Sequence, residues 1–304
     1  MMKIEITEKL SLTDEQDSLL SMHSILNTMN VLISQIYQLA DFLDDKSLVQ
    51  NCMPPCKEIV AALSDHDDAI ESIRNIGRSV QEIQSSIADV IARHPDLRTT
   101  EQLQAHTDNI ESIFTILEVR GREILARANQ PDMWINYSID DLINNFHDIF
   151  TAIEQNAHGK YKIVYNIASK NTLDYFINCG ISSPDQVNIL MPAVLQDVMR
   201  DLILNARKYT DLGGTIIAGL VDDGANLFFV VEDNGRGIPA DQIEQVVQYG
   251  ERARNVQDKE TKGGGFGLTK AYYVTKQFGG RMWIESEENR GSTITISIPS
   301  QLEA

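Results

Sequence analysis

Four short runs of residues, in a fixed order, constrain the fold of this chain more than any other feature. They are Asp201-Leu-Ile-Leu-Asn205-Ala-Arg-Lys208-Tyr209, Asp233-Asn-Gly235-Arg-Gly237, Gly263-Gly-Gly265-Phe-Gly267-Leu268 and Gly291-Ser-Thr293. Each run alone is a weak signal, because similar turns and helix faces are common in proteins. Together they predict one pocket that ligates a metal ion, binds an adenine ring and surrounds a triphosphate.

The first run is predicted to be helical and to present three polar side chains together. Asp201, Asn205 and Lys208 follow the spacing of one helix face. A carboxylate and an amide oxygen on that face can hold a hard cation or its waters, and Lys208 can contact a phosphate. A solvated helix face with a chance charge pattern is the simpler interpretation of this run by itself.

The second run is predicted to contact the base. Asp233 ends a predicted strand, and its carboxylate can accept a hydrogen bond from the amino group of adenine. Gly235 and Gly237 lack Cβ, so the backbone there can approach the ring. An ordinary Asp-Asn-Gly turn is the alternative.

The third run is predicted to bind the phosphates. Its glycines precede a helix that begins near Leu268, and exposed amides before a helix N-terminus bind anions. The alternative is a flexible linker, although a linker is rarely fused to a helix start. Residues 238–262 are polar and are predicted to be a mobile lid over the phosphates. The lid carries the cationic residues Arg252, Arg254, Lys259 and Lys262.

The second half of the chain resembles the ATP-binding domain shared by sensor histidine kinases, DNA gyrase, MutL and anti-sigma-factor kinases. The resemblance covers about residues 137 to 300 and rests on all four runs. The Asn-Ala-Arg-Lys-Tyr-Thr run at 205–210 and the Gly-Gly-Arg-Met-Trp-Ile-Glu-Ser-Glu run at 279–287 are typical of the histidine-kinase branch. No Walker-type or protein-kinase motif is present in the sequence.

The resemblance implies ATP and Mg²⁺ as cofactors and a role for each run. Asn205 is expected to ligate Mg²⁺ and Asp233 to bind adenine, with the glycines bordering the phosphates. The residues expected at the nucleotide are Asn205, Lys208, Tyr209, Asp233, Gly235, Gly237, Gly263, Gly265, Gly267, Leu268 and Thr293.

Residues 1–130 are predicted to form an all-helical bundle. A helix over 14–47 begins with a capping box between Thr13 and Gln16. Further helices are predicted at about 56–93 and 99–129, with Pro54-Pro55 ending the first segment and Thr99 capping the last. The first helix carries an apolar seam of Leu19, Met22, Leu26, Met29, Ile33, Ile36, Ala40 and Leu43. A bundle of about three such helices is completed by dimerisation or, alternatively, is closed as a monomer.

Residues 137–304 are predicted to form an α/β sandwich that is the ATP-binding catalytic domain. Helices are predicted at 140–154, from Pro192 through the run at 201–209, and at 269–277. Strands are predicted at 161–167, 187–191, 214–221, 225–233, 281–286 and 292–299. The first domain, 1–130, is then the dimerisation and histidine phosphotransfer domain.

His23 is the candidate phosphate acceptor, because histidine kinases place that histidine on a long bundle helix. It lies just off the seam and is predicted to be partly exposed, with Asn27 and Asn30 on the same face. A neutral imidazole is a nucleophile near neutral pH, so its nitrogen can attack the γ-phosphate beside a metal ion. A surface histidine on a bundle helix is the alternative.

Two positions depart from the family pattern. Family members carry Glu or Asp after the acceptor histidine, and this chain has Ser24. Asp201 stands where many kinases have Asn and gyrase-like ATPases have a Glu that activates water, so it is either a general base or a metal-shell ligand. Asn27 keeps the amide that positions water for phosphatase chemistry. The predicted catalytic residues are therefore His23, Asn27 and Asp201.

The leading hypothesis is a homodimeric histidine autokinase that passes phosphate to the receiver domain of a response regulator. A separate sensory protein is expected to supply its input. The alternatives are an ATP-binding switch without phosphoryl transfer and a serine kinase or ATPase that uses Asp201.

The composition limits location and partners. A net charge of −18 argues against nucleic acid as a partner. No stretch approaches the ~20 apolar residues of a membrane span, and the acidic N-terminus is unlike a signal peptide, so we expect a cytoplasmic protein. Cys52 and Cys56 lack nearby further ligands and are interpreted as inert.

Overall fold

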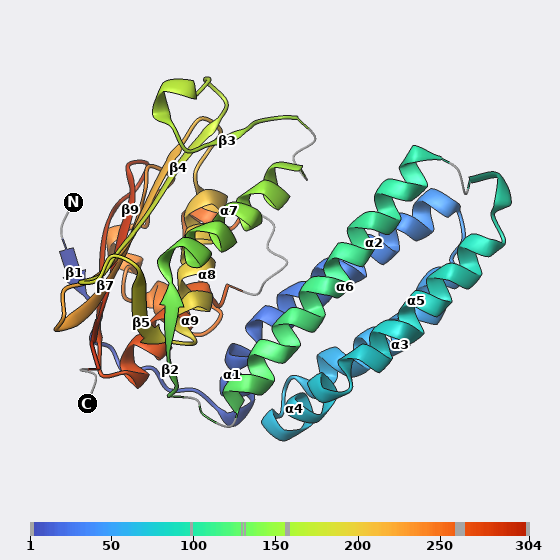
Figure 1. Ribbon diagram of the computed structural model, residues 1–304, viewed down its shortest axis with the longest axis horizontal. Helices are drawn as coiled ribbons and strands as arrows, with labels where there is room; N and C mark the ends of the chain where they lie inside the picture. The colour runs from blue at the N-terminus through green and yellow to red at the C-terminus, as the bar shows by residue number, and fades with distance from the viewer. Residues whose placement is uncertain are drawn as a thin grey trace. The chain divides into compact units, whose positions relative to one another are not determined.

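The computed structural model describes residues 3–97, 100–128, 130, 132–155, 159–258 and 265–301, with Ala152 and Gln155 described by their backbone. The chain forms two compact units. Residues 11 to 131 make the helical unit, whereas residues 3–10 join the chain after residue 131 in the α/β unit. The helical unit is therefore inserted between the first strand and the rest of the α/β unit (Figure 1).

Within its described residues the helical unit contains six α-helices. They are α1 (Asp14–Ser21), α2 (His23–Leu43), α3 (Ser47–Ala62), α4 (His66–Arg74), α5 (Ile76–Ala92) and α6 (Glu101–Ala128). Helices α2, α3, α5 and α6 form a ring in which each contacts its two neighbours. Their inward apolar side chains make one continuous core, so four helices of a single chain close this bundle.

The predicted division into about three helices is wrong at two places. Met22 leaves helical geometry (φ −92°, ψ 8°) and separates α1 from α2. Pro54 and Pro55 lie inside α3 and do not end it. A proline inside a helix costs roughly 3 kcal/mol, and the burial of flanking residues such as Cys52 and Cys56 on α3 offsets this cost. The predicted cap at Thr99 lies outside the described residues.

The apolar face of α2 is wider than the predicted seam. Ile25, Leu32 and Leu39 are fully buried although the seam omits them, whereas Leu26 and Ile33 are only partly buried. The reason is that α2 packs against both α3 and α6, so two flanks of the helix face apolar neighbours.

The α/β unit is built on a seven-stranded mixed sheet with the order β1-β8-β9-β7-β6-β4-β3. Its strands are β1 (Lys3–Glu5), β3 (Ile163–Val164), β4 (Tyr175–Ser182), β6 (Thr215–Asp222), β7 (Asn226–Asp233), β8 (Arg281–Glu287) and β9 (Gly291–Pro299). β3, β4 and β6 run parallel, and the other neighbours are antiparallel. A separate pair joins β2 (Trp134–Ser138) to β5 (Asn188–Pro192).

Helices α7 (Ile139–Gln155), α8 (Leu195–Tyr209) and α9 (Gly267–Gln277) lie against one face of the large sheet (Figure 1). The predicted α/β sandwich after a helical region is thus confirmed. In the part of the chain that the structure describes, no helix is long and apolar enough to cross a membrane.

Two strands of the sheet were not predicted. β4 pairs in parallel with β6, and most of the strand predicted at 161–167 is short β3 followed by a 3-10 turn. β1 comes from the start of the chain and pairs with β8. It is fixed by Ile6, which is fully buried, and by a 2.7 Å hydrogen bond from the Tyr272 hydroxyl to the carbonyl oxygen of Glu8.

Candidate functional site

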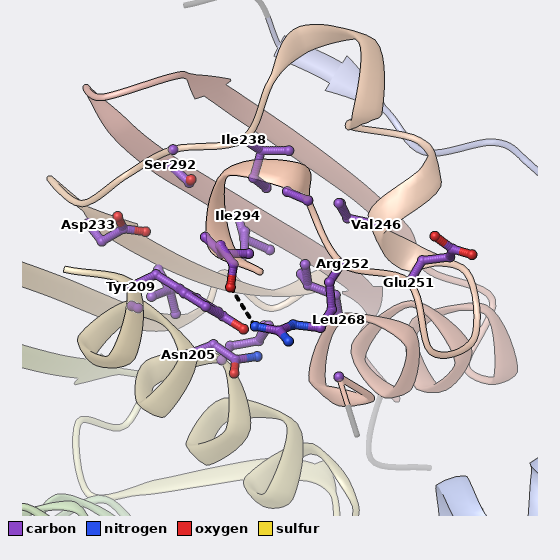
Figure 2. Close-up of a pocket in the computed structure, with 17 residues that line it drawn as sticks. Asn205, Tyr209, Asp233, Ile238, Val246, Glu251, Arg252, Leu268, Ser292 and Ile294 are labelled. Carbon is purple, nitrogen blue, oxygen red and sulfur yellow. Dashed lines mark hydrogen bonds between the residues drawn. The ribbon is translucent and has the colours of Figure 1, made fainter. Parts of the chain in front are cut away.

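A pocket lies between α8, the ends of β7 and β9, the segment 237–256 and the start of α9 (Figure 2). Its lining includes Asn205, Tyr209, Asp233, Gly237, Gly265 and Leu268, which come from three of the four sequence runs. The other lining residues are Leu202, Ala206, Val231, Ile238, Val246, Glu251, Arg252, Ala253, Val256, Ser292 and Ile294.

Two cross-strand residue pairs, where β7 ends and β9 begins, form the floor of the pocket. Asp233 is paired with Ser292, and Val231 with Ile294. Side chains two residues apart in a strand share a face, so all four point into the pocket. The Gly235 amide donates to Asp233 Oδ1 at 2.8 Å, yet burial raises the pKa of this carboxyl to about 6.

The two glycines after Asp233 are needed because other segments of backbone pack directly against them. A Cβ on Gly235 would lie 2.4 Å from the carbonyl oxygen of Tyr209. Gly237 has φ +64°, and a Cβ there would lie 2.1 Å from the carbonyl oxygen of Glu287. The turn is therefore held against the end of α8, which fixes the position of Asp233 beside the pocket.

Helix α8 contributes one face to the pocket. Asn205 and Tyr209 lie on it one turn apart, as the sequence predicts (Figure 2). Lys208 is not part of the lining. Its Nζ lies 5.4 Å from the ring centre of Tyr209, and burial, with a smaller effect of Arg252, lowers its pKa. Asp201 also lies outside the lining and forms ion pairs that are described below.

The glycine-rich run meets Asn205 directly. Gly267 is the first residue of α9, and a Cβ on it would lie 2.3 Å from Asn205 Nδ2. This contact places the amides of the first turn of α9, with the positive end of the helix dipole, next to the amide of Asn205. Gly265 and Leu268 line the pocket. Gly263, Lys259 and Lys262 lie outside the described residues.

The described part of the predicted lid is more apolar than its charge suggests. Ile238, Val246 and Val256 line the pocket, and the two valines lie in short 3-10 turns. Arg252 reaches toward Asn205 and Tyr209, and its Nη2 donates to the Val256 carbonyl oxygen at 2.6 Å (Figure 2). The sequence analysis missed these apolar residues, although the pair at 246–247 within a polar segment was an available signal.

Thr293 does not line the pocket. It lies on β9 opposite Glu232, on the other face of the sheet from Ser292 and Ile294. Strand alternation explains this placement, since neighbours in a strand point to opposite faces. The same rule applied to the final run could have identified Ser292 in advance.

The chemistry of the site fits Mg²⁺ only together with a nucleotide. Among the described residues, no group of three or more His, Cys, Asp or Glu side chains could hold a metal ion. Mg²⁺ is commonly bound by few protein oxygens plus substrate phosphates and waters. The amide oxygen of Asn205, next to the start of α9, suits this arrangement.

His23 and Asn27 lie in the helical unit. His23 is the first residue of α2, and its Nε2 is 2.9 Å from Asn27 Nδ2. The predicted partial exposure of His23 is wrong, because only 3% of it is accessible. The non-helical turn at Met22 rotates His23 away from the position that a continuous helix would give it. Cys52 and Cys56 are also fully buried, and burial raises their pKa values to about 11 and 12, as expected of inert thiols.

The pocket brings together a buried carboxylate, apolar side chains and the N-terminus of α9, a combination that suits a nucleotide. Residues 192–302 match the family described as "Histidine kinase-, DNA gyrase B-, and HSP90-like ATPase". The match lies within the α/β unit, and proteins similar to the chain carry the names of sensor histidine kinases.

Three relatives show the extent of the similarity. The chain is 34% identical over 105 residues to aerobic respiration control sensor protein ArcB of Escherichia coli, covering 34% of this chain and 14% of ArcB. It is 24% identical over 233 residues to sensor histidine kinase RppB of Synechocystis, covering 73% and 47%. It is 32% identical over 107 residues to sensor histidine kinase WalK of Bacillus subtilis, covering 34% and 18%. The chain thus spans less than half the length of these relatives.

Solved structures of two histidine kinases are also similar to the chain. The catalytic domain of ThkA is 18% identical with a TM-score of 0.39, covering 56% of this chain and 99% of that domain. Full-length ShkA in complex with AMPPNP is 21% identical with a TM-score of 0.41, covering 68% of this chain and 40% of ShkA.

Proposed function

We propose that this chain is a histidine autokinase that binds ATP with Mg²⁺ and transfers the γ-phosphoryl group to His23. The observation that carries the proposal is one pocket lined both by buried Asp233 and by Asn205, which contacts Gly267 at the start of α9. Relatives named sensor histidine kinases support the choice of acceptor chemistry.

Each pocket residue has a role in this proposal. Asp233 accepts a hydrogen bond from the amino group of adenine, and the apolar walls formed by Val231, Ile238 and Ile294 contact the ring. The amides at the start of α9 bind phosphate oxygens, and Asn205 contributes one oxygen ligand to Mg²⁺. The metal ion supplies neutralisation of phosphate charge.

The transfer makes a P–N bond to an imidazole nitrogen of His23 while the bond from the γ-phosphorus to the β,γ-bridging oxygen of ATP breaks. ADP leaves, and the imidazole loses its proton to solvent or to a neighbouring base. Ser24 offers no carboxylate for that step, so we expect slow autophosphorylation. Phosphate then passes to an aspartate of a response-regulator receiver domain. In the phosphatase reaction, Asn27 positions the water that hydrolyses this aspartyl phosphate and releases inorganic phosphate.

Because His23 is buried, the transfer requires local opening around the ring. We expect this opening at Met22, where the helical backbone is interrupted between α1 and α2. A signal that separates α1 from α2 would then control exposure of the acceptor.

The test is labelling with γ-³²P-ATP and Mg²⁺. The wild-type chain and a His66→Gln control, which alters an exposed histidine of α4, are expected to carry acid-labile label. His23→Gln is expected to carry none. Equal labelling of His23→Gln and the wild type would overturn the assignment of the acceptor.

A nucleotide-dependent switch without phosphoryl transfer is the second candidate, favoured by the burial of His23 and by Ser24. It predicts stoichiometric ATP binding by calorimetry and no acid-labile phosphoprotein. No observation favours a hydrolytic ATPase or serine kinase that uses Asp201, since this carboxylate faces Lys270 and does not line the pocket.

The partners and location follow from the same proposal. As a member of a two-component pathway, the chain would act on a response regulator, receive its signal from a separate sensory protein and work in the cytoplasm. Homodimerisation is proposed from the relatives and not from the apolar seam, because most of that seam is buried within one chain. Sedimentation of the purified chain at micromolar concentration tests it, and a strictly monomeric species would exclude it.

A further inference from the structure

Four charged side chains join α8 to α9 beside the nucleotide pocket. They are Asp197, Arg200 and Asp201 on α8, and Lys270 on α9; we call them the α8–α9 charge cluster. Arg200 Nη2 is 2.8 Å from Asp197 Oδ1, and Lys270 Nζ is 3.6 Å from Asp197 Oδ2 and 3.8 Å from Asp201 Oδ2. The side chains are between 4% and 11% exposed.

The cluster balances two buried anions with two buried cations. Burial of an ion without a partner costs several kcal/mol, so the cluster persists only while its members keep their separation. Three of the members belong to a single turn of α8. Lys270 is the one member on α9, so its ion pairs fix the spacing between the two helices.

The cluster adjoins the contact that forms the metal end of the pocket. Asp201 precedes Asn205 by one turn of α8, and Lys270 follows Gly267 by nearly one turn of α9. Lys270 faces Asp201, and Gly267 faces Asn205 at the approach of 2.3 Å given above. These are successive contacts between the same two antiparallel helices.

We propose that Lys270 is a positioning residue for the triphosphate and its metal ion. Its ammonium group forms ion pairs with the carboxylates of Asp201 and Asp197. These ion pairs thereby set the distance between the first turn of α9 and Asn205. Lys270 itself contacts no substrate. This inference deepens the proposed function, because it assumes that the pocket takes a nucleoside triphosphate with a divalent cation.

The experiment compares two ligands that use different ends of the pocket. Lys270→Met keeps most of the side-chain length and removes the charge. We expect the affinity for Mg²⁺-ATP to fall on the order of tenfold, while adenosine, which is bound at the Asp233 end, changes by less than about twofold. Lys276→Met, on an exposed position of the same helix, is the matched control and is expected to bind both ligands like the wild type.

A double variant separates charge from bulk. Asp201→Asn combined with Lys270→Met removes one negative and one positive charge. The remaining Asp197–Arg200 ion pair then carries no net charge. We expect it to recover most of the Mg²⁺-ATP affinity that Lys270→Met loses. Lys270→Arg keeps the charge and is expected to retain more of the Mg²⁺-ATP affinity than Lys270→Met.

Three results would overturn the proposal: unchanged Mg²⁺-ATP affinity in Lys270→Met, equal losses for both ligands, or no recovery in the double variant. If circular dichroism shows that Lys270→Met does not fold, Lys270→Arg and the double variant decide, and a folded double variant with tenfold weaker Mg²⁺-ATP binding contradicts the idea. The assay involves no phosphoryl transfer, so it is independent of His23. Failure of the wild type to bind either ligand would instead contradict the proposed function.

Discussion

The side chains of His23 and Asn27 meet one turn apart on α2, with His23 Nε2 2.9 Å from Asn27 Nδ2. The imidazole is almost completely buried, so this contact satisfies a nitrogen that water does not reach in the folded state. The ring of the proposed phosphate acceptor thus also makes a buried hydrogen bond that supports the fold.

Asn27→Ala is predicted to lower the free energy of unfolding by about 1 kcal/mol, because it leaves a buried ring nitrogen without this bond. Urea unfolding followed by circular dichroism measures the effect. Asn51→Ala, at an exposed position within α3, is the control for helix propensity and is expected to change stability by less than about 0.5 kcal/mol. Equal effects of the two substitutions would mean that the His23 contact adds no stability.

Nucleotide affinity is predicted to weaken as the pH falls through 6. Burial raises the pKa of Asp233 to about 6, and protonation of this carboxyl removes acceptor capacity that the amino group of adenine needs. Adenosine binding, measured by calorimetry, is therefore expected to be several-fold weaker at pH 5 than at pH 7.5. Asp233→Asn is expected to bind weakly at both pH values, and a wild-type affinity that is flat between them would contradict this role.

The same carboxyl is predicted to affect stability in the opposite direction. Its folded-state pKa lies above the ordinary value of 3.8, so the folded protein binds the proton first as the pH falls. As the pH falls from about 6 to about 4, protonation of Asp233 therefore increases the free energy of unfolding. Comparison of the wild type with Asp233→Asn by urea unfolding across that range isolates this contribution, which should be missing in the variant.

Asp45 is predicted to make the helical unit sensitive to acid. The Ser47 hydroxyl, His94 and the Ser47 amide lower the pKa of this carboxyl from 3.8 to about 2, with a smaller effect of Arg93. A lowered pKa gives stability that is present above about pH 4 and is lost as the pH falls toward 2.

Asp45→Asn is therefore expected to unfold at lower urea concentration than the wild type at pH 5, with the difference shrinking at pH 2.5. Asp89→Asn, at an exposed position of α5, serves as the control. If Asp89→Asn shows the same pH-dependent difference, the Asp45 contacts are not its source.

Ile6→Ala is predicted to destabilise the α/β unit although the residue precedes the entire helical unit. Ile6 is fully buried in the core of the α/β unit, and removal of such a side chain costs about 2–5 kcal/mol. Ile167→Ala, in the same unit but 65% exposed, is expected to cost less than about 0.5 kcal/mol. Similar thermal unfolding of both variants would show that β1 does not stabilise this core.

The elements with strong local signals were predictable. Thr13 and Gln16 form the expected reciprocal cap on α1, since both hydrogen bonds lie within one turn of the chain. The hairpin of β6 and β7 and the turn after Asp233 depend on adjacent residues in the same way. The strands of the large sheet that were missed, β1 and β4, have partners far along the chain, and β1 has only three residues.

The sequence by itself determined the kind of nucleotide site, because the order of its four runs fixes which side chains can meet at the ends of neighbouring strands and helices. Tertiary structure alone decided three other features: the burial of His23, the closure of the apolar seam within one chain and the pairing of Lys270 with Asp201. The physical reason is that spacing along the chain sets which residues share a face, whereas burial and ion pairing depend on what packs against that face.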